Sequence, residues 1–159
     1  MKRALLLAMR MILGAVLMYA AWTKLRAPWP QFAISINSYQ VVPLTWLEPL
    51  ARILPWVEMT LGLGLLSGLL LRWFGLASSL LLGFFFSLMI RSWAIGLNID
   101  CGCFGPGEAL GPMTMLRDGA LVALAIAITV TAFRSGAKIT ESRAVASADA
   151  GLTREAERA

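Results

Sequence analysis

The sequence predicts an all-α integral membrane protein, a bundle of four transmembrane helices, from its composition and from the spacing of its apolar residues. Of the 159 residues, 58% are hydrophobic and only 14% are charged. A soluble domain carries about 25% charged residues, so this chain has too few charges for a surface that faces water. The apolar residues gather in four long stretches, which indicates that lipid surrounds the protein.

The four apolar stretches cover about residues 4–22, 53–71, 73–97 and 113–133. A helix needs about 20 mainly apolar residues to cross a hydrocarbon core of about 30 Å, and each stretch meets that length. They predict a transmembrane domain over residues 1–134. The segment 135–159 is polar and lacks apolar periodicity, so we expect a disordered or frayed tail.

The connections between these stretches differ in length. Only Leu71, Arg72 and Trp73 join the second and third stretches, which predicts a tight helical hairpin. The connection 26–52 is longer, contains several prolines and carries tryptophans that suit the membrane interface. The first stretch is long for a signal peptide and is predicted to be a retained helix. The glycines at 62, 64 and 68 favour close helix packing.

Lysine and arginine near the helix ends predict the orientation. With both termini in the cytoplasm of a bacterial inner (cell) membrane, the N-terminal basic cluster and the turn at Arg72 lie inside, as the positive-inside rule favours. Both long loops, including the one that carries the cysteines, then lie outside the cytoplasm.

The composition also excludes several chemistries. The chain has no histidine, which removes imidazole as a metal ligand or a catalytic base. No basic cluster with interleaved aromatic residues is present, so no nucleic-acid partner is expected.

The two cysteines, Cys101 and Cys103, flank Gly102 in the loop between the third and fourth stretches. Two cysteines one residue apart can close a disulfide only in a tight ring, and Gly102 permits the backbone angles that this requires. A strained disulfide is easily reduced, which favours thiol–disulfide exchange as the role of the pair. Inert buried cysteines, a local structural disulfide and a soft-metal site for Cu(I) or Hg(II) stay open as alternatives.

Ionisable residues lie at one depth on all four predicted helices, just beneath the cysteine loop. Intramembrane charges are costly and normally face a partner or a wet cavity. We therefore predict a supporting polar layer, although helix-end roles for the same residues stay open. Its members are Lys24, Glu58, Arg91, Arg117 and Asp118.

These residues resemble a known family. Lys24, Pro55-x-x-Glu58, the string Cys101-Gly102-Cys103-Phe104-Gly105 and Arg117-Asp118 are similar to the DoxX-like superfamily, and within it to the methylamine utilisation protein MauE group, over residues 5–134. The resemblance implies a four-helix membrane bundle with a role in extracytoplasmic thiol redox. It also implies support for maturation of a disulfide-containing periplasmic enzyme, alongside a thioredoxin-like partner that must be a separate protein.

The sequence therefore predicts electron exchange between Cys101 and Cys103 and a periplasmic thioredoxin-like protein. Asp100 adjoins Cys101 and disfavours its thiolate, which favours Cys103 as the attacking residue. A quinone held near Arg91 and Arg117 is one candidate electron carrier, although no quinone motif is visible and the chain has one cysteine pair where a quinone-coupled relay normally has two. Soft-metal transport, a non-catalytic accessory subunit and a homo-oligomer stay open, as does the question of whether the chain is an enzyme.

Overall fold

A computed structural model of the protein describes residues 2–97, 99–102, 104 and 108–156, with side chains described between residues 4 and 134 of these ranges. Over this part of the chain the protein has five helices and no strand. They are α1 (Lys2–Arg26), α2 (Trp29–Ser38), α3 (Leu44–Ser67), α4 (Leu71–Ala94) and α5 (Pro112–Ala156). Four are long and apolar enough to cross a membrane, over Ala4–Arg26, Leu44–Ser67, Leu71–Ala94 and Pro112–Arg134. The predicted all-α fold with four spans is confirmed.

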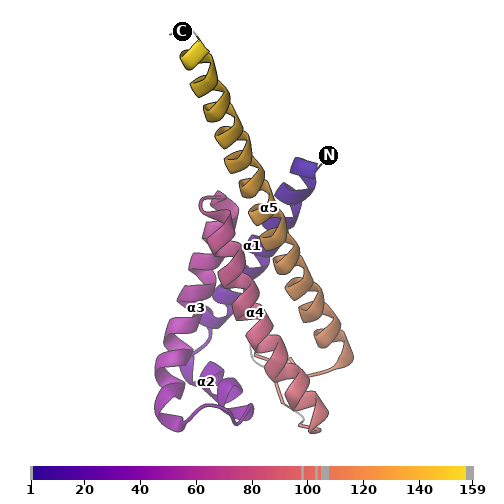
Figure 1. Cartoon of the computed structure of the whole chain (residues 1–159). Helices are drawn as coiled ribbons and strands as arrows, with labels where there is room; N and C mark the ends of the chain where they lie inside the picture. The colour runs from indigo at the N-terminus through magenta and orange to yellow at the C-terminus, as the bar shows by residue number, and fades with distance from the viewer. Residues whose placement is uncertain (1, 98, 103, 105–107, 157–159) are drawn as a thin grey trace.

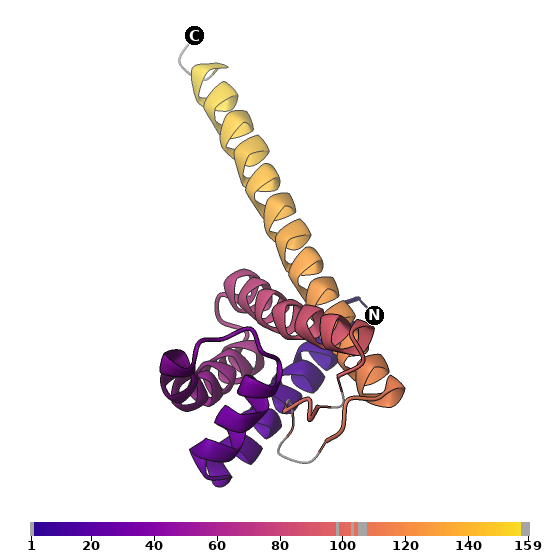
Figure 2. The ribbon, with the colours of Figure 1, turned by 90° about the horizontal axis from the view of Figure 1, so that it is seen from below.

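The long helices pack as two pairs, α1 against α3 and α4 against α5. Both chain ends and the α3–α4 turn lie at one end of the bundle (Figure 1), whereas α2 and the loop between α4 and α5 lie at the opposite end. Figure 2 looks onto that opposite end and shows the loop beside the ends of the long helices. The cysteine loop and the chain termini therefore occupy opposite ends of the bundle.

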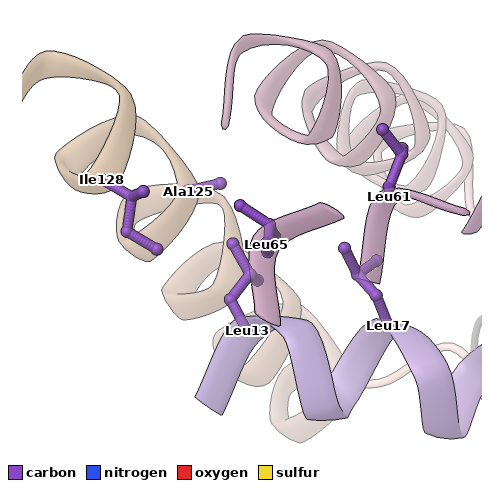
Figure 3. Packing of buried hydrophobic residues seen from close by; sticks show 6 residues of the cluster. All are labelled: Leu13, Leu17, Leu61, Leu65, Ala125 and Ile128. Carbon is purple, nitrogen blue, oxygen red and sulfur yellow. The ribbon is translucent and has the colours of Figure 1, made fainter. Parts of the chain in front are cut away.

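The main core lies where α1, α3 and α5 meet. Figure 3 shows six buried side chains there, Leu13 and Leu17 from α1, Leu61 and Leu65 from α3, and Ala125 and Ile128 from α5. Large apolar side chains such as Leu63 and Leu80 are exposed instead, at 52% and 66%. In a membrane these outward side chains contact lipid tails, so burial inside the bundle is limited to the helix contacts.

Glycines let α1 and α3 approach closely. A Cβ atom on Gly62 would lie 2.9 Å from the backbone oxygen of Gly14, and a Cβ on Gly14 would lie 3.0 Å from the backbone oxygen of Gly62. Neither oxygen can move away without moving its helix. The predicted close packing at Gly62 is therefore present, in the manner of small residues between membrane helices.

Replacing Gly62 with alanine is expected to lower the free energy of unfolding by about 1–3 kcal/mol, because the added methyl group overpacks this crossing. The midpoint of detergent unfolding measures the effect. Gly83→Ala is the matched control, since a Cβ on Gly83 of α4 meets nothing within 4 Å. Equal midpoints for the two variants would contradict the close crossing.

The α3–α4 hairpin is tight, as predicted, but its turn covers residues 68–70. The predicted turn at Leu71, Arg72 and Trp73 is wrong, because these residues belong to α4. Gly68 ends α3 in the left-handed conformation, with φ of 72°, and its N–H bonds to the oxygen of Gly64. The guanidinium of Arg10 on α1 donates to the carbonyl oxygen of Leu66 at 3.2 Å and so satisfies one of the unpaired carbonyls at this helix end.

Helices α3 and α5 extend furthest beyond their apolar stretches. α3 begins at Leu44 although its apolar stretch begins near residue 53, and it contains both Pro49 and Pro55. Side chains of this early part, such as Ala51, pack with Phe32 and Ile36 of α2, and this packing compensates for the hydrogen bond that Pro49 cannot make. α5 continues as a helix past its apolar part to Ala156.

Candidate functional site

The arms of the cysteine loop are held by backbone pairing. Asp100 and Ala109 form an antiparallel bridge. The N–H of Cys101 donates to the oxygen of Glu108 at 2.8 Å, and the N–H of Leu110 donates to the oxygen of Ile99 at the same distance. Cys101 is thus fixed by main-chain contacts and is only 3% exposed. Cys103 lies outside the described residues.

The backbone of Gly102 has a left-handed conformation, with φ of 65°, which glycine adopts readily. A Cβ on Gly102 would also lie 2.9 Å from the Cβ of Ser35, so the glycine allows the loop to lie directly on α2. The hydroxyl of Tyr39, just after α2, donates to the oxygen of Cys101 at 2.8 Å. The contacts of α2 and Tyr39 with the loop therefore hold Cys101 in place.

The thiol of Cys101 faces a carboxylate. Its Sγ lies 3.4 Å from Oε2 of Glu108, with the thiol as donor. Arg117 of α5 holds that carboxylate with two hydrogen bonds, of 2.8 Å to Oε1 and 3.0 Å to Oε2. The guanidinium also lies over the ring of Phe104, 4.1 Å from its centroid. The loop is thereby tied to α5 at the position of the sulfur.

Hydrogen bonds from Arg117 hold the pKa of Glu108 below its usual value, and the attraction of the guanidinium and the hydrogen bond from Cys101 act in the same direction. Glu108 is therefore ionised at neutral pH. The ion pair contributes to stability above the carboxyl's unfolded-state pKa, and this contribution is lost as pH falls through the lowered folded-state pKa. The pair is partly exposed, so we expect a small effect on overall stability.

Lys24 and Glu58 form a buried ion pair between α1 and α3. The ammonium of Lys24 donates to both carboxylate oxygens, at 2.6 and 2.8 Å, and the two side chains are 3% and 7% exposed. Lys24 also lies 5.2 Å from the ring centroid of Phe32. The structure thus brings these two predicted members of the polar layer into contact.

The other three predicted members of the polar layer, Arg117, Asp118 and Arg91, do not all take part in ion pairs. Arg117 donates from Nε to Asp118 at 2.9 Å, and Asp118 is 7% exposed. Arg91 is exposed and, among the described residues, donates to the carbonyl oxygen of Tyr39 at 3.4 Å. Four of the five residues therefore form two ion pairs, Lys24 with Glu58 and Arg117 with Asp118, and Arg91 belongs to neither pair.

A cavity lies between α1, α2, α4 and α5 directly beneath the cysteine loop. Most of the space in it is narrow, because side chains close around it. Its walls are mainly apolar and aromatic, with Phe85, Phe86 and Met89 of α4. Lys24, Glu58, Asp118, Cys101 and Gly102 also line it. A second hollow, wide and open, reaches Glu108 and Arg117 from the outside.

Sequence reasoning missed Glu108 and Tyr39. Glu108 is a loop carboxylate with no helical or spacing signal, and only the folded loop brings it to Cys101. Its position, five residues after Cys103 and nine before Arg117, is compatible both with a carboxylate in water and with one in an ion pair, so the sequence does not distinguish the two. Tyr39 follows the short helix α2, which the apolar pattern of the sequence does not predict.

Known proteins resemble this chain over most of its length. The family model for methylamine utilisation protein MauE matches residues 2–131. A methylamine utilization protein MauE of Paracoccus denitrificans is 33% identical over 124 residues, which cover 76% of this chain and 66% of the relative. The match thus spans just under two thirds of that relative's length. No solved structure matches.

Four apolar spans, with a polar cysteine site at one end of the bundle, define a polytopic membrane protein. The chain belongs to the methylamine utilisation protein MauE family, because the family model covers nearly all of the four-helix region.

Proposed function

We propose that this membrane protein carries out thiol–disulfide exchange through Cys101 and Cys103 with a thioredoxin-like partner outside the cytoplasm. The observation that carries the proposal is the placement of Cys101, whose thiol donates to an arginine-held carboxylate above a cavity with buried charge. An inert buried cysteine needs only apolar neighbours. A carboxylate in contact with a thiol, above a cavity lined by buried charges, is typical of a site whose protonation matters.

The biological role follows from the family. The Paracoccus relative is named for methylamine utilization, and we propose that this chain supports the same process by helping a disulfide-containing protein to mature. Cys101 is 3% exposed, so a folded partner cannot reach its sulfur while the loop keeps this conformation. Exchange with a protein therefore begins at Cys103.

The proposed orientation places both termini in the cytoplasm and the loop outside. An impermeant maleimide is then expected to label a Cys101→Ser variant, whose single thiol is Cys103, in intact spheroplasts. A cysteine introduced at exposed Trp73, beside the α3–α4 turn, serves as the opposite control and is expected to react only after lysis. Labelling in the reverse order would contradict the orientation.

The cavity beneath the loop supports a quinone as the electron carrier. Oxidation of two thiols to a disulfide releases two electrons and two protons, and a quinone takes up both as it becomes a quinol. The walls of the cavity are apolar and aromatic, as in sites for lipid-soluble rings, and Cys101 lines the same space. The space is narrow, so a quinone ring enters only when side chains of the walls move apart. Lys24 and Asp118 supply charged groups there, so the quinone would lie beside Lys24 and not near Arg91.

A single-turnover experiment tests this step. Reduced protein in lipid nanodiscs, mixed with a short-chain ubiquinone, is expected to convert one quinone to quinol while two alkylatable thiols disappear. Met89→Trp, which narrows the cavity, is expected to slow the reaction at least tenfold, whereas Phe84→Trp on the exposed face of α4 leaves it unchanged. If Cys101 and Cys103 exchange with glutathione but never reduce the quinone, a quinone is excluded as the electron carrier. Stoichiometric Cu(I) binding without exchange would favour the metal alternative.

A further inference from the structure

Glu108 is the nearest acceptor that the described residues offer to the Cys101 thiol. The Oε2 atom that lies 3.4 Å from Sγ also accepts a hydrogen bond from Arg117. The loop backbone fixes this geometry, because the N–H of Cys101 bonds to the carbonyl oxygen of the same glutamate. Two separate contacts therefore join these two residues.

The charges around Cys101 act on the thiol in different directions. Glu108 contacts the sulfur, and Asp100 is the preceding residue. Arg117 is the cation on this side, and two carboxylates, Glu108 and Asp118, already bind it. From the cavity side, Lys24 is bound to Glu58, and Arg91 donates to the carbonyl oxygen of Tyr39. Among the described residues, Glu108 is the charged group in contact with the sulfur, and a carboxylate so close to a sulfur disfavours the thiolate form.

Glu108 also faces the outside of the bundle. Together with Arg117, Phe104 and Tyr19 it lines an open hollow there. Its side chain is 36% exposed, whereas Cys101 is 3% exposed. A proton can therefore reach Cys101 by way of this carboxylate without crossing the apolar cavity.

We propose that Glu108 is the proton partner of Cys101 and that it makes the two cysteines unequal: Cys101 is the inner cysteine, which leaves the disulfide and is kept as a thiol, and Cys103 is the residue that the partner attacks. This inference rests on the proposed exchange function. A partner thiolate attacks the Cys103 sulfur of the internal disulfide, forms the mixed disulfide and releases Cys101, which takes up a proton by way of Glu108. The second partner thiolate then attacks the partner sulfur of the mixed disulfide, so the partner becomes a disulfide and Cys103 leaves as a thiolate that takes up a proton from water. The two partner thiols supply the two protons and two electrons, and the protein dithiol that remains is the one that the quinone oxidises.

The test measures thiol reactivity without any partner. In a Cys103→Ser background the rate of Cys101 alkylation by a small maleimide is recorded against pH in detergent. Adding Glu108→Gln is expected to move the midpoint of this profile down by about one pH unit or more, because the repelling charge is gone. Glu108→Asp is expected to restore most of the original midpoint. Glu48→Gln, which removes an exposed carboxylate paired with Arg52 on α3, is the matched control and leaves the profile unchanged.

A purely structural role for Glu108 gives a different result. If Glu108→Gln only loosens the loop, alkylation becomes faster at every pH and the midpoint stays in place. That outcome would overturn the inference. Because the profile needs no exchange reaction, it stands apart from the proposed function, which fails instead if neither single-cysteine variant forms a mixed disulfide with any protein.

Discussion

Replacing Lys24 with methionine is expected to lower the free energy of unfolding by about 3–5 kcal/mol, the cost of breaking a buried ion pair by removing one partner. The substitution leaves the Glu58 carboxylate without its two hydrogen bonds in an apolar cavity. Lys24 and Glu58 also join α1 to α3 near the cysteine loop, so the loss is expected to loosen that end of the bundle. The midpoint of detergent unfolding in mixed micelles measures it.

Two further variants separate the effect of an unpaired charge from the loss of an ion pair as such. The double variant Lys24→Met with Glu58→Met removes both charges and is expected to recover most of the lost stability, because no charge is then left unpaired. Arg52→Met breaks an exposed pair with Glu48 and is expected to cost less than about 1 kcal/mol. A Lys24→Met variant as stable as Arg52→Met would show that the buried pair is unimportant for the fold.

Loss of either sulfur is expected to have the largest effect on activity. Cys101→Ser and Cys103→Ser should each reduce quinone-dependent oxidation of dithiothreitol to the uncatalysed rate, since one thiol cannot form the internal disulfide. Unfolding midpoints are expected to stay near that of the unsubstituted protein, because serine is close to cysteine in size. Turnover that survives in both variants would contradict a role for the pair in electron transfer.

The spans were predictable because membrane helices follow from length and hydropathy alone. The start of α3 was not predictable. The part between Leu44 and Ile53 is helical because it packs on α2, whereas the local sequence, which contains Pro49, predicts a break in the helix. The hairpin at Gly68 was predictable from the short connection. Its exact turn depends on the left-handed conformation of Gly68 and on the contact of Arg10.

The site was predictable only in part. Lys24 and Glu58 were recognisable because charges inside apolar stretches need partners. Arg91 also lies inside an apolar stretch, yet it is exposed and donates to the carbonyl oxygen of Tyr39, because the position of a residue along a helix does not show which way its side chain faces. Glu108 gave no signal, since loop closure and not sequence spacing brings it to Cys101.

The central claim is that Cys101 and Cys103 exchange disulfides with a protein outside the cytoplasm, and trapping tests it most directly. Cells that make either single-cysteine variant are quenched with acid, alkylated and resolved without reducing agent. We expect the Cys101→Ser variant, which keeps Cys103, to carry a thioredoxin-like protein in a bond that dithiothreitol cleaves, and the Cys103→Ser variant to carry little or none. Capture of no protein by either variant would contradict the claim.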